Sequence, residues 1–189
     1  MSILRFFLAY TLISFAAFCQ AADYGFDIQN AEMLSSGKSL ELRANISFRF
    51  SQRAIEALNN GVPLTLIVQV KVNRNRRFIW NKTVVKKKFV YRLTYRALPG
   101  RFRVFTQSNG QYRSFTSMKA AVETLGRIHE IDLMNLDDVQ EGKLYTAHLK
   151  AYLDIESLPL PLRSVAYLIP QWYISSAWFK WPLEKLSHP

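Results

Sequence analysis

The three histidines, His129, His148 and His188, are the residues whose type suits them to hold a metal ion or to move a proton. His129 and the glutamate after it would open a zinc-protease motif if a second histidine stood at position 133, but that residue is Leu133. There is no i, i+4 pair of histidines, and the only cysteine is Cys19. We therefore expect surface histidines, no metal site and no cofactor.

Residues 36–39 (SGKS) have the ending of a phosphate-binding P-loop. That loop needs another glycine five residues before Gly37, where this chain has Glu32, and it must lead from a strand into a helix. Here the following segment alternates like a strand. We interpret the segment as a hairpin turn.

Asp137, Asp138 and Glu141 form an acidic group, but the regular spacing of oxygen ligands in a calcium loop is missing from the sequence. The Gly-x-Ser-x-Gly nucleophile elbow is missing as well. We predict that the protein is not an enzyme, and a hydrolase with an unrecognised site is the least favoured alternative.

Basic residues give the strongest functional signal. Between residues 74 and 103 the chain has no Asp or Glu, but it has Arg74, Arg76, Arg77, Lys82, Lys86, Lys87, Lys88, Arg92, Arg96, Arg101 and Arg103. Such a density of like charge attracts anions. Our candidates for contact with an anion or a partner are Lys86, Lys88, Arg92, Arg96, Arg101 and Arg103. Anionic lipid, lipopolysaccharide, wall polymer or an acidic protein face is the expected partner, nucleic acid is not, and an ordinary solvated face is the alternative.

Aromatic residues crowd the C-terminal segment, where the sequence has Tyr167, Trp172, Tyr173, Trp178, Phe179 and Trp181. Aromatic side chains fill sandwich cores, and they also form belts at membrane interfaces. We favour the core for these residues over an exposed belt.

Residues 1–22 have the layout of a secretory signal peptide. Arg5 precedes an almost wholly apolar run at residues 6–18, and Ala21 and Ala22 follow it. The run is shorter than the roughly 20 residues of a spanning helix, so we expect cleavage there and not a retained anchor. The protein is then periplasmic or otherwise exported. Residues 23–189, cysteine-free in a chain of net charge +11, are expected to form a single domain.

Alternation of apolar and polar residues dominates this region and is typical of half-buried strands. It predicts strands at residues 26–34, 40–50, 64–72, 85–97, 101–107, 111–115 and 145–155, with helices at 52–59 and from Thr116 or Ser117 to Gly126. Asn109 and Gly110 suit a tight hairpin turn. The predicted fold class is mainly β: an antiparallel β-sandwich or partly closed barrel with two short helices.

Two details follow from the pattern. Pro159 and Pro161 each bias the preceding residue toward extended geometry, which predicts a stiff connector at residues 158–162. In the long fourth segment of alternation, Lys87 falls on the apolar side. Its ammonium group must therefore reach past its neighbours or lie near the end of the strand.

Several segments resemble one protein family. They are residues 54–64 (AIEALNNGVPL), 98–104 (LPGRFRV), 125–128 (LGRI), 154–163 (DIESLPLPLR), 165–167 (VAY) and 178–183 (WFKWPL). On these segments the chain resembles the DUF4390 family, exported proteobacterial proteins of unassigned function. The resemblance brings no catalytic residues. It implies a gene beside one for a sensor histidine kinase of the nitrogen-response type, and residues 86–88 are more lysine-rich than expected of that family.

We therefore expect a non-enzymatic periplasmic binding or accessory module that interacts with an envelope protein such as a sensor histidine kinase. The alternative is a peripheral binder of anionic membrane or envelope polymer that acts through the basic face.

Overall fold

The computed structural model describes residues 23–76, 80–140 and 142–183 of the chain. The predicted signal peptide, Arg77, Glu141 and His188 lie outside the described residues. Among the residues that are described, no helix combines the length and the apolar character needed to cross a membrane.

In this part of the chain, nine strands form two antiparallel sheets. They are β1 (Gly25–Ser36), β2 (Ser39–Arg49), β3 (Leu64–Arg74), β4 (Lys82–Arg96), β5 (Arg101–Thr106), β6 (Gln111–Phe115), β7 (Arg127–Asn135), β8 (Tyr145–Leu153) and β9 (Phe179–Leu183). The smaller sheet has the order β1-β2-β7 and the larger sheet the order β6-β5-β4-β3-β8-β9. Each of the predicted strands is therefore present.

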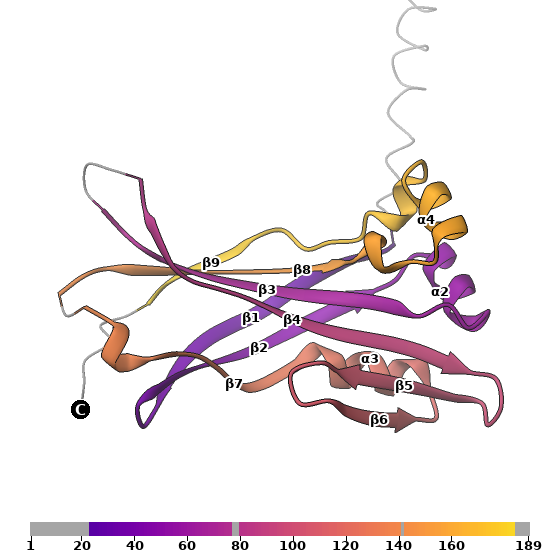
Figure 1. Cartoon of the computed structure of the whole chain (residues 1–189), viewed down its shortest axis with the longest axis horizontal. Helices are drawn as coiled ribbons and strands as arrows, with labels where there is room; N and C mark the ends of the chain where they lie inside the picture. Colours follow the sequence, from indigo (N-terminus) through magenta and orange to yellow (C-terminus); the bar gives the residue numbers. More distant parts are fainter. Residues whose placement is uncertain (1–22, 77–79, 141, 184–189) are drawn as a thin grey trace, which may run out of the picture.

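Short helices connect the strands. The α-helices are α2 (Gln52–Asn59), α3 (Met118–Gly126) and α4 (Leu160–Ala166), and the 3₁₀ turns are η2 (Leu136–Asp138), η3 (Ile155–Ser157) and η4 (Pro170–Trp172). Figure 1 shows α2 and α4 at one end of an elongated molecule whose long strands run between the two ends.

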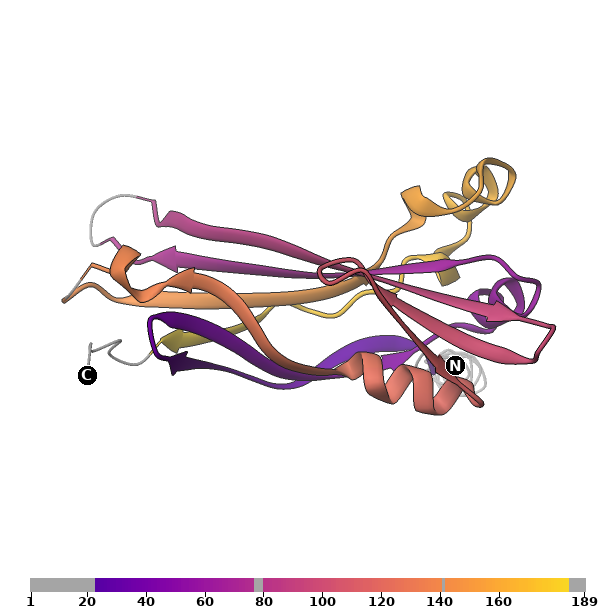
Figure 2. The ribbon, with the colours of Figure 1, turned by 60° about the horizontal axis from the view of Figure 1, so that its bottom comes forward.

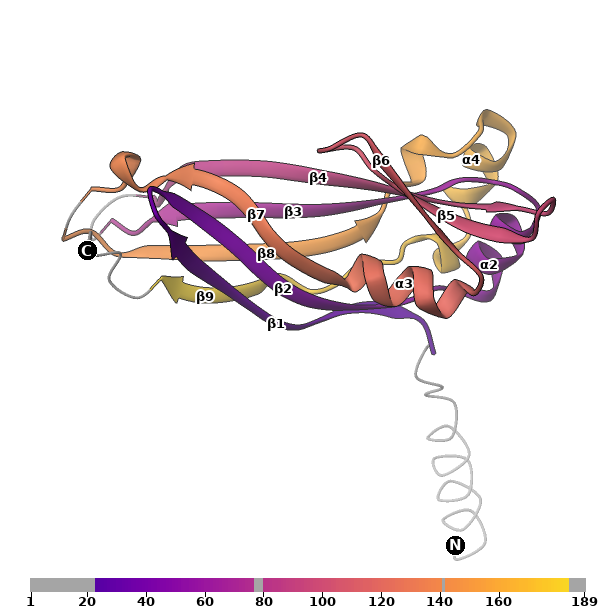
Figure 3. The ribbon, with the colours of Figure 1, turned by 90° about the horizontal axis from the view of Figure 1, so that it is seen from below.

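The two sheets pack face to face around a shared apolar core. Figure 2 shows the β1–β2 hairpin beneath the long strands of the larger sheet, and Figure 3 shows β1, β2 and β7 crossing those strands obliquely. Alternate residues of each sheet point inward, and Leu42, Leu66, Val68 and Leu149 are fully buried together. The fold is thus an antiparallel β-sandwich, the first of the two expected forms.

Both predicted helices are present, and each has a serine at its N-cap. The Ser51 hydroxyl accepts a hydrogen bond from the backbone of Ala54 at 3.3 Å, and the Ser117 hydroxyl accepts one from Ala120 at 3.2 Å. At the end of α3, Gly126 lies so close to β2 that an added Cβ would be 2.1 Å from the carbonyl oxygen of Ile46. Only glycine fits this approach of α3 to the smaller sheet.

The predicted connector at residues 158–162 is wrong beyond Pro159. Leu158 and Pro159 are extended, but α4 begins at Leu160, with Pro161 in its first turn. Proline is tolerated there because the first backbone N–H groups of a helix have no partner within the helix. Arg163 then donates from Nε and Nη2 to the Leu158 carbonyl at 3.1 and 2.9 Å, which holds the start of α4 against the buried Leu158.

Candidate anion-binding face

The register of four strands aligns four side chains across the outer face of the larger sheet. Lys86 of β4 lies opposite Lys71 of β3, Lys71 lies opposite His148 of β8, and His148 lies opposite Lys180 of β9. Directly opposite residues share a face, with Cβ atoms about 4.5–5.5 Å apart. Three lysines and a histidine therefore form one row, drawn from segments far apart in the sequence.

A second row runs beside the first and ends at a tryptophan. Lys88 of β4 lies opposite Gln69 of β3, and Gln69 lies opposite Lys150 of β8. The ring of Trp178 has the Lys71 Nζ at 4.6 Å and the Lys150 Nζ at 5.9 Å from its centre. Such cation–π contacts favour the ammonium groups at these positions. We call Lys71, Lys86, Lys88, Lys150 and Lys180 the lysine patch.

The predicted arginines occupy the other half of the same face. Arg96 of β4 lies opposite Arg101 of β5, and Arg103 shares their side of the hairpin, with its guanidinium carbon 4.5 Å from the centre of the Tyr112 ring. Arg92 follows Lys88 by four residues, which is about 13 Å along a strand. We call Arg92, Arg96, Arg101 and Arg103 the arginine group. The structure thus separates the six sequence candidates: Lys86 and Lys88 join the lysine patch, and the four arginines form a second group.

Carboxylates are missing from the whole larger sheet. Its six strands, with the bounds given above, contain no Asp or Glu. The ion pairs between described residues join Glu32 to Arg43 at 3.7 Å on the smaller sheet and Lys119 to Glu123 at 4.0 Å on α3. Among the residues described, the lysine patch therefore has no carboxylate partner.

The positive charge of this face affects the pKa of His148. Its Nε2 lies 3.2 Å from the amide nitrogen of Asn73, and its ring meets Trp178 edge-on at 6.3 Å between centres. Burial lowers the pKa of His148 below its usual value, and the positive charges of Lys180 and Lys71 lower it further. Burial, together with the positive charges beside it, thus favours the neutral form of the histidine.

Lys87 points away from this face, toward the other sheet. Lys86, Lys88, Arg92 and Arg96 are exposed on the outer side of β4. The Lys87 ammonium group instead reaches across to the smaller sheet and donates to the carbonyl of Asp132 in β7 at 3.2 Å. Lys87 therefore snorkels, which is one of the two ways that the sequence offered for a charged residue on the apolar side of this strand.

A pocket of about 360 Å³ adjoins the lysine patch. Polar and aromatic side chains line most of it: Gln69, Lys150, Tyr152, Tyr173, Ser175 and Trp178. The hydroxyl of Tyr173 donates to the carbonyl of Tyr167 at 2.9 Å, which fixes one wall. Sequence reasoning missed this pocket, because β3, β8 and the segment before β9 meet only in the folded chain.

The C-terminal aromatic residues divide between core and surface. Trp172 is buried in the core, and Trp178, Phe179 and Trp181 are half-buried. Tyr167 and Tyr173 are exposed by 46% and 56%. The predicted core position is therefore right for Trp172 and wrong for the two tyrosines, which stand over the turns beside α4.

Three larger hollows lie elsewhere among the described residues, and one of them, of about 580 Å³, lies between the start of β4 and the end of β7. A groove of about 790 Å³ runs between α3 and β2, and a cleft of about 610 Å³ opens where β4 and β5 part from β7. The cleft has the titratable residues Arg113, Arg127, His129 and Asp132 on its walls. Within the described residues these four side chains share no hydrogen bond or ion pair, and no group of three potential metal ligands is found.

The chain was compared with known proteins, and a family model matches most of its length. Searches of curated proteins and of solved structures return no match. The sequence profile of the family described as "Domain of unknown function (DUF4390)" matches residues 23–182, a range that takes in both sheets and the lysine patch. The chain therefore belongs to the DUF4390 family.

Proposed function

We propose that this protein is an exported, non-enzymatic module that binds an anionic component of the cell envelope through the outer face of its larger sheet. One observation carries the proposal: the aligned rows of the lysine patch lie on a sheet whose six strands contain no Asp or Glu. On its described strands, a face built this way presents positive charge with no carboxylate beside it. It attracts polyanions over a distance and holds them by many weak contacts.

The strand register gives a reason to regard the patch as selected for binding. Like charges that face each other across strands destabilise a sheet. Lys86 and Lys71 are in this position, and Lys71 also faces a histidine. A surface needed only for solubility would be more stable with both signs interspersed, as in the Glu32–Arg43 pair of the smaller sheet.

The test compares two variants that remove the same net charge from different faces. The first carries Lys71→Gln, Lys86→Gln, Lys150→Gln and Lys180→Gln. The control carries Lys38→Gln, Arg49→Gln, Arg53→Gln and Lys119→Gln, which are exposed and lie off the larger sheet. Binding to dextran sulfate and to phosphatidylglycerol vesicles is measured by co-sedimentation, with circular dichroism to verify folding.

We expect the patch variant to lose at least about tenfold in affinity and the control to change by less than about twofold. Binding by the unaltered protein should weaken steeply between 0.1 and 1 M salt, where the screening length falls from about 10 Å to about 3 Å. Neutralising the arginine group should lower the affinity as well, because it lies on the same face. Equal losses from the patch and control variants would show that net charge alone is responsible, and the proposal would fail.

A second candidate function rests on α4. Leu160, Val165 and Leu168 expose 72%, 48% and 85% of their surface at one end of the molecule. Exposed apolar groups of this kind mark protein contacts. They favour an accessory module that touches an envelope protein such as a sensor histidine kinase. In-cell crosslinking from position 168 should then recover a single envelope partner, and recovery of the protein alone would remove this candidate.

A further inference from the structure

The pocket beside the lysine patch has two chemically different sides. On one side, Lys150 and Trp178 line the pocket, and the ammonium group of Lys71, which is not part of the lining, also lies over the Trp178 ring. On the other, Gln69, Ser175 and the tyrosines 152 and 173 supply an amide and hydroxyl groups beside aromatic rings. A ligand that fills both sides carries an anionic group at one end and a polar ring at the other.

The anionic side suits a phosphate better than a carboxylate. Lysine ammonium groups act as separate point charges and fit a tetrahedral oxyanion with several acceptor oxygens, whereas a planar carboxylate pairs best with the fork of an arginine. Among the described residues that line the pocket the cation is Lys150, and Lys71 lies next to it over the same tryptophan ring. The arginine group lies farther along the sheet.

The polar side suits a sugar ring. A hydroxyl group both donates and accepts hydrogen bonds, and so do the side chains of Gln69, Ser175 and the two tyrosines. The Gln69 amide has no hydrogen-bond partner among the described residues, although Gln69 is partly buried between Lys88 and Lys150. A volume of about 360 Å³ is at the small end of ligand pockets, which span about 300–1,000 Å³. It accommodates a group the size of one sugar.

We infer that this pocket binds a phosphorylated saccharide, with the phosphate on Lys71 and Lys150 and the sugar ring against Gln69 and Tyr173. The inference rests on the proposed function, because it names the class of anion that the face receives. In a longer saccharide, the sugar units beyond the bound one would extend over the open lysine patch.

The first experiment titrates the protein with glucose 6-phosphate, glucose, inorganic phosphate and adenosine 5′-monophosphate, and follows the indole N–H signal of Trp178 by NMR. The signal is assigned with Trp178→Phe. Glucose 6-phosphate should shift it with a Kd at least about tenfold lower than that of glucose or phosphate. Equal affinity for inorganic phosphate, or tighter binding of the nucleotide, would overturn the sugar assignment.

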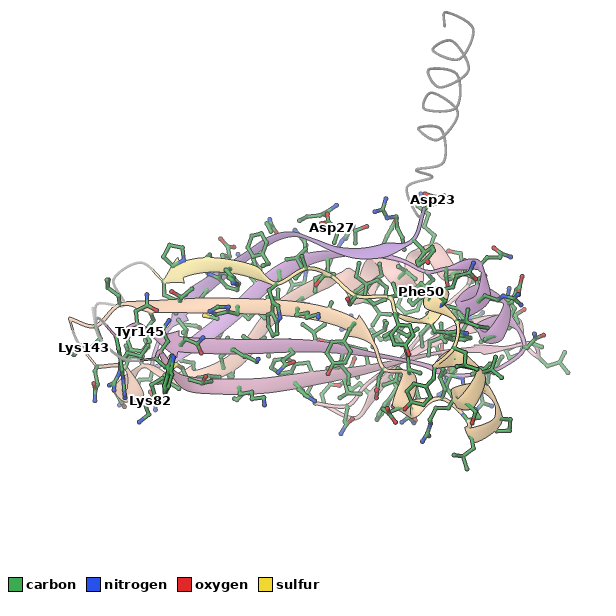
Figure 4. All side chains as sticks on the ribbon, turned by 90° about the horizontal axis from the view of Figure 1, so that it is seen from above. Asp23, Asp27, Phe50, Lys82, Lys143 and Tyr145 are labelled. Atoms are coloured by element: carbon green, nitrogen blue, oxygen red, sulfur yellow. The ribbon has the colours of Figure 1, made fainter. Side chains whose placement is uncertain are left out.

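The second experiment uses single substitutions with matched controls. Gln69→Ala should weaken glucose 6-phosphate binding at least about fivefold and change dextran sulfate binding by less than about twofold. Lys150→Gln, which also belongs to the lysine patch, should weaken both, and glucose 6-phosphate binding by the larger factor. Gln29→Ala on the smaller sheet and Lys82→Gln at the far end of β4 are the controls, and both should leave glucose 6-phosphate binding unchanged. Figure 4 shows Lys82 at the end of the molecule, beside Lys143 and Tyr145.

The last experiment separates free from membrane-linked ligands. Vesicles that contain the phosphorylated glycolipid lipid A are compared with vesicles of phosphatidylglycerol, each in competition with glucose 6-phosphate. If glucose 6-phosphate competes with lipid A vesicles but not with phosphatidylglycerol vesicles, the source is a membrane glycolipid. If glucose 6-phosphate binds but lipid A vesicles do not, the source is a soluble sugar phosphate. If no phosphorylated sugar binds while dextran sulfate still does, this inference is wrong and the proposed function stands. If both fail, the proposed function fails too.

Discussion

The two sheets of the sandwich pack on each other but carry different patterns of charge on their strands. The smaller sheet mixes signs, with Glu32 and Arg43 directly opposite each other in the register of β1 and β2 and joined as an ion pair. The larger sheet carries cations alone, and it aligns them in rows. Surface charge on the first sheet is balanced locally, and on the second it remains available to something outside the chain.

The difference suggests a division of roles. The smaller sheet and its helix α3 contribute packing contacts that cannot be altered without loss of stability. The outer face of the larger sheet is open to substitution as far as folding is concerned, and under the proposed function its charge serves ligand binding. Substitutions in the two regions should therefore separate stability from binding.

The largest effect on stability is expected at the contact between α3 and β2. Gly126→Ala places a Cβ 2.1 Å from the Ile46 carbonyl oxygen, so the backbone must shift. We expect the free energy of unfolding to fall by about 1–3 kcal/mol, the usual range for overpacking. Urea denaturation measures it. Lys119→Ala, exposed on the same helix, is the control and should change stability by no more than about 0.5 kcal/mol. A Gly126→Ala variant of unchanged stability would contradict the close approach.

A smaller effect is expected where the two sheets are joined by Lys87. Lys87→Met keeps the apolar stem but removes the hydrogen bond to the Asp132 carbonyl. We expect a loss of about 1 kcal/mol in unfolding free energy and faster amide exchange in β7. Lys88→Met, the neighbour on the outer face, is the matched control and should change binding instead. If the two variants lost the same free energy of unfolding, the hydrogen bond from Lys87 to Asp132 would not be what stabilises the fold.

A gain in stability is expected from reversing one charge of the patch. Lys86→Glu replaces a like-charged pair with Lys71 by an opposite pair at facing positions. We expect the free energy of unfolding to rise by about 0.2–1 kcal/mol and dextran sulfate binding to fall. Thermal denaturation and co-sedimentation are the measurements. A variant that binds as well as the parent protein would remove the link between the patch and anions.

The smallest effect is expected from pH at His148, whose pKa is lowered in the folded chain. The unfolded chain then binds more protons than the folded chain between the usual histidine value of about 6.5 and the lowered one, so His148 makes the protein less stable as the pH falls through that window. An NMR titration of the ring should show the low pKa. Lys180→Gln should raise the pKa, because one of the positive charges is removed, and an unchanged value would mean that Lys180 does not contribute to the shift.

Alternation of apolar and polar residues in the sequence predicts seven of the nine described strands, because one residue in two of such a strand faces the core. It misses β7, where register irregularities at Leu40/Glu41 and Leu42/Ala44 of its partner β2 interrupt the pairing. The buried residues of β7 therefore stand at both even and odd positions, such as Ile128 and Leu133, and its sequence lacks the simple alternation of apolar and polar residues. It misses β9 because Pro182 is unusual in a strand, although proline is tolerated at a sheet edge.

The site was predictable only in part. Alternation along β4 places Lys86 and Lys88 on the outer face, which the structure reproduces. It says nothing of which strands are neighbours, and Lys71, Lys150 and Lys180 join the patch only through the pairing of β3, β8 and β9. Strand order depends on long-range packing, and no local pattern in the sequence encodes it.

The position of β3 also governs how the chain can fold. This strand lies between β4, its hairpin partner, and β8, which begins only at Tyr145. Until β8 is added, the most thoroughly buried strand of the sandwich has one unpaired edge, and such an edge is a template for pairing with other chains. Closure over so long a separation is slow. A chain still lacking β8 is therefore expected to be prone to aggregation until its C-terminal third has joined the sheet.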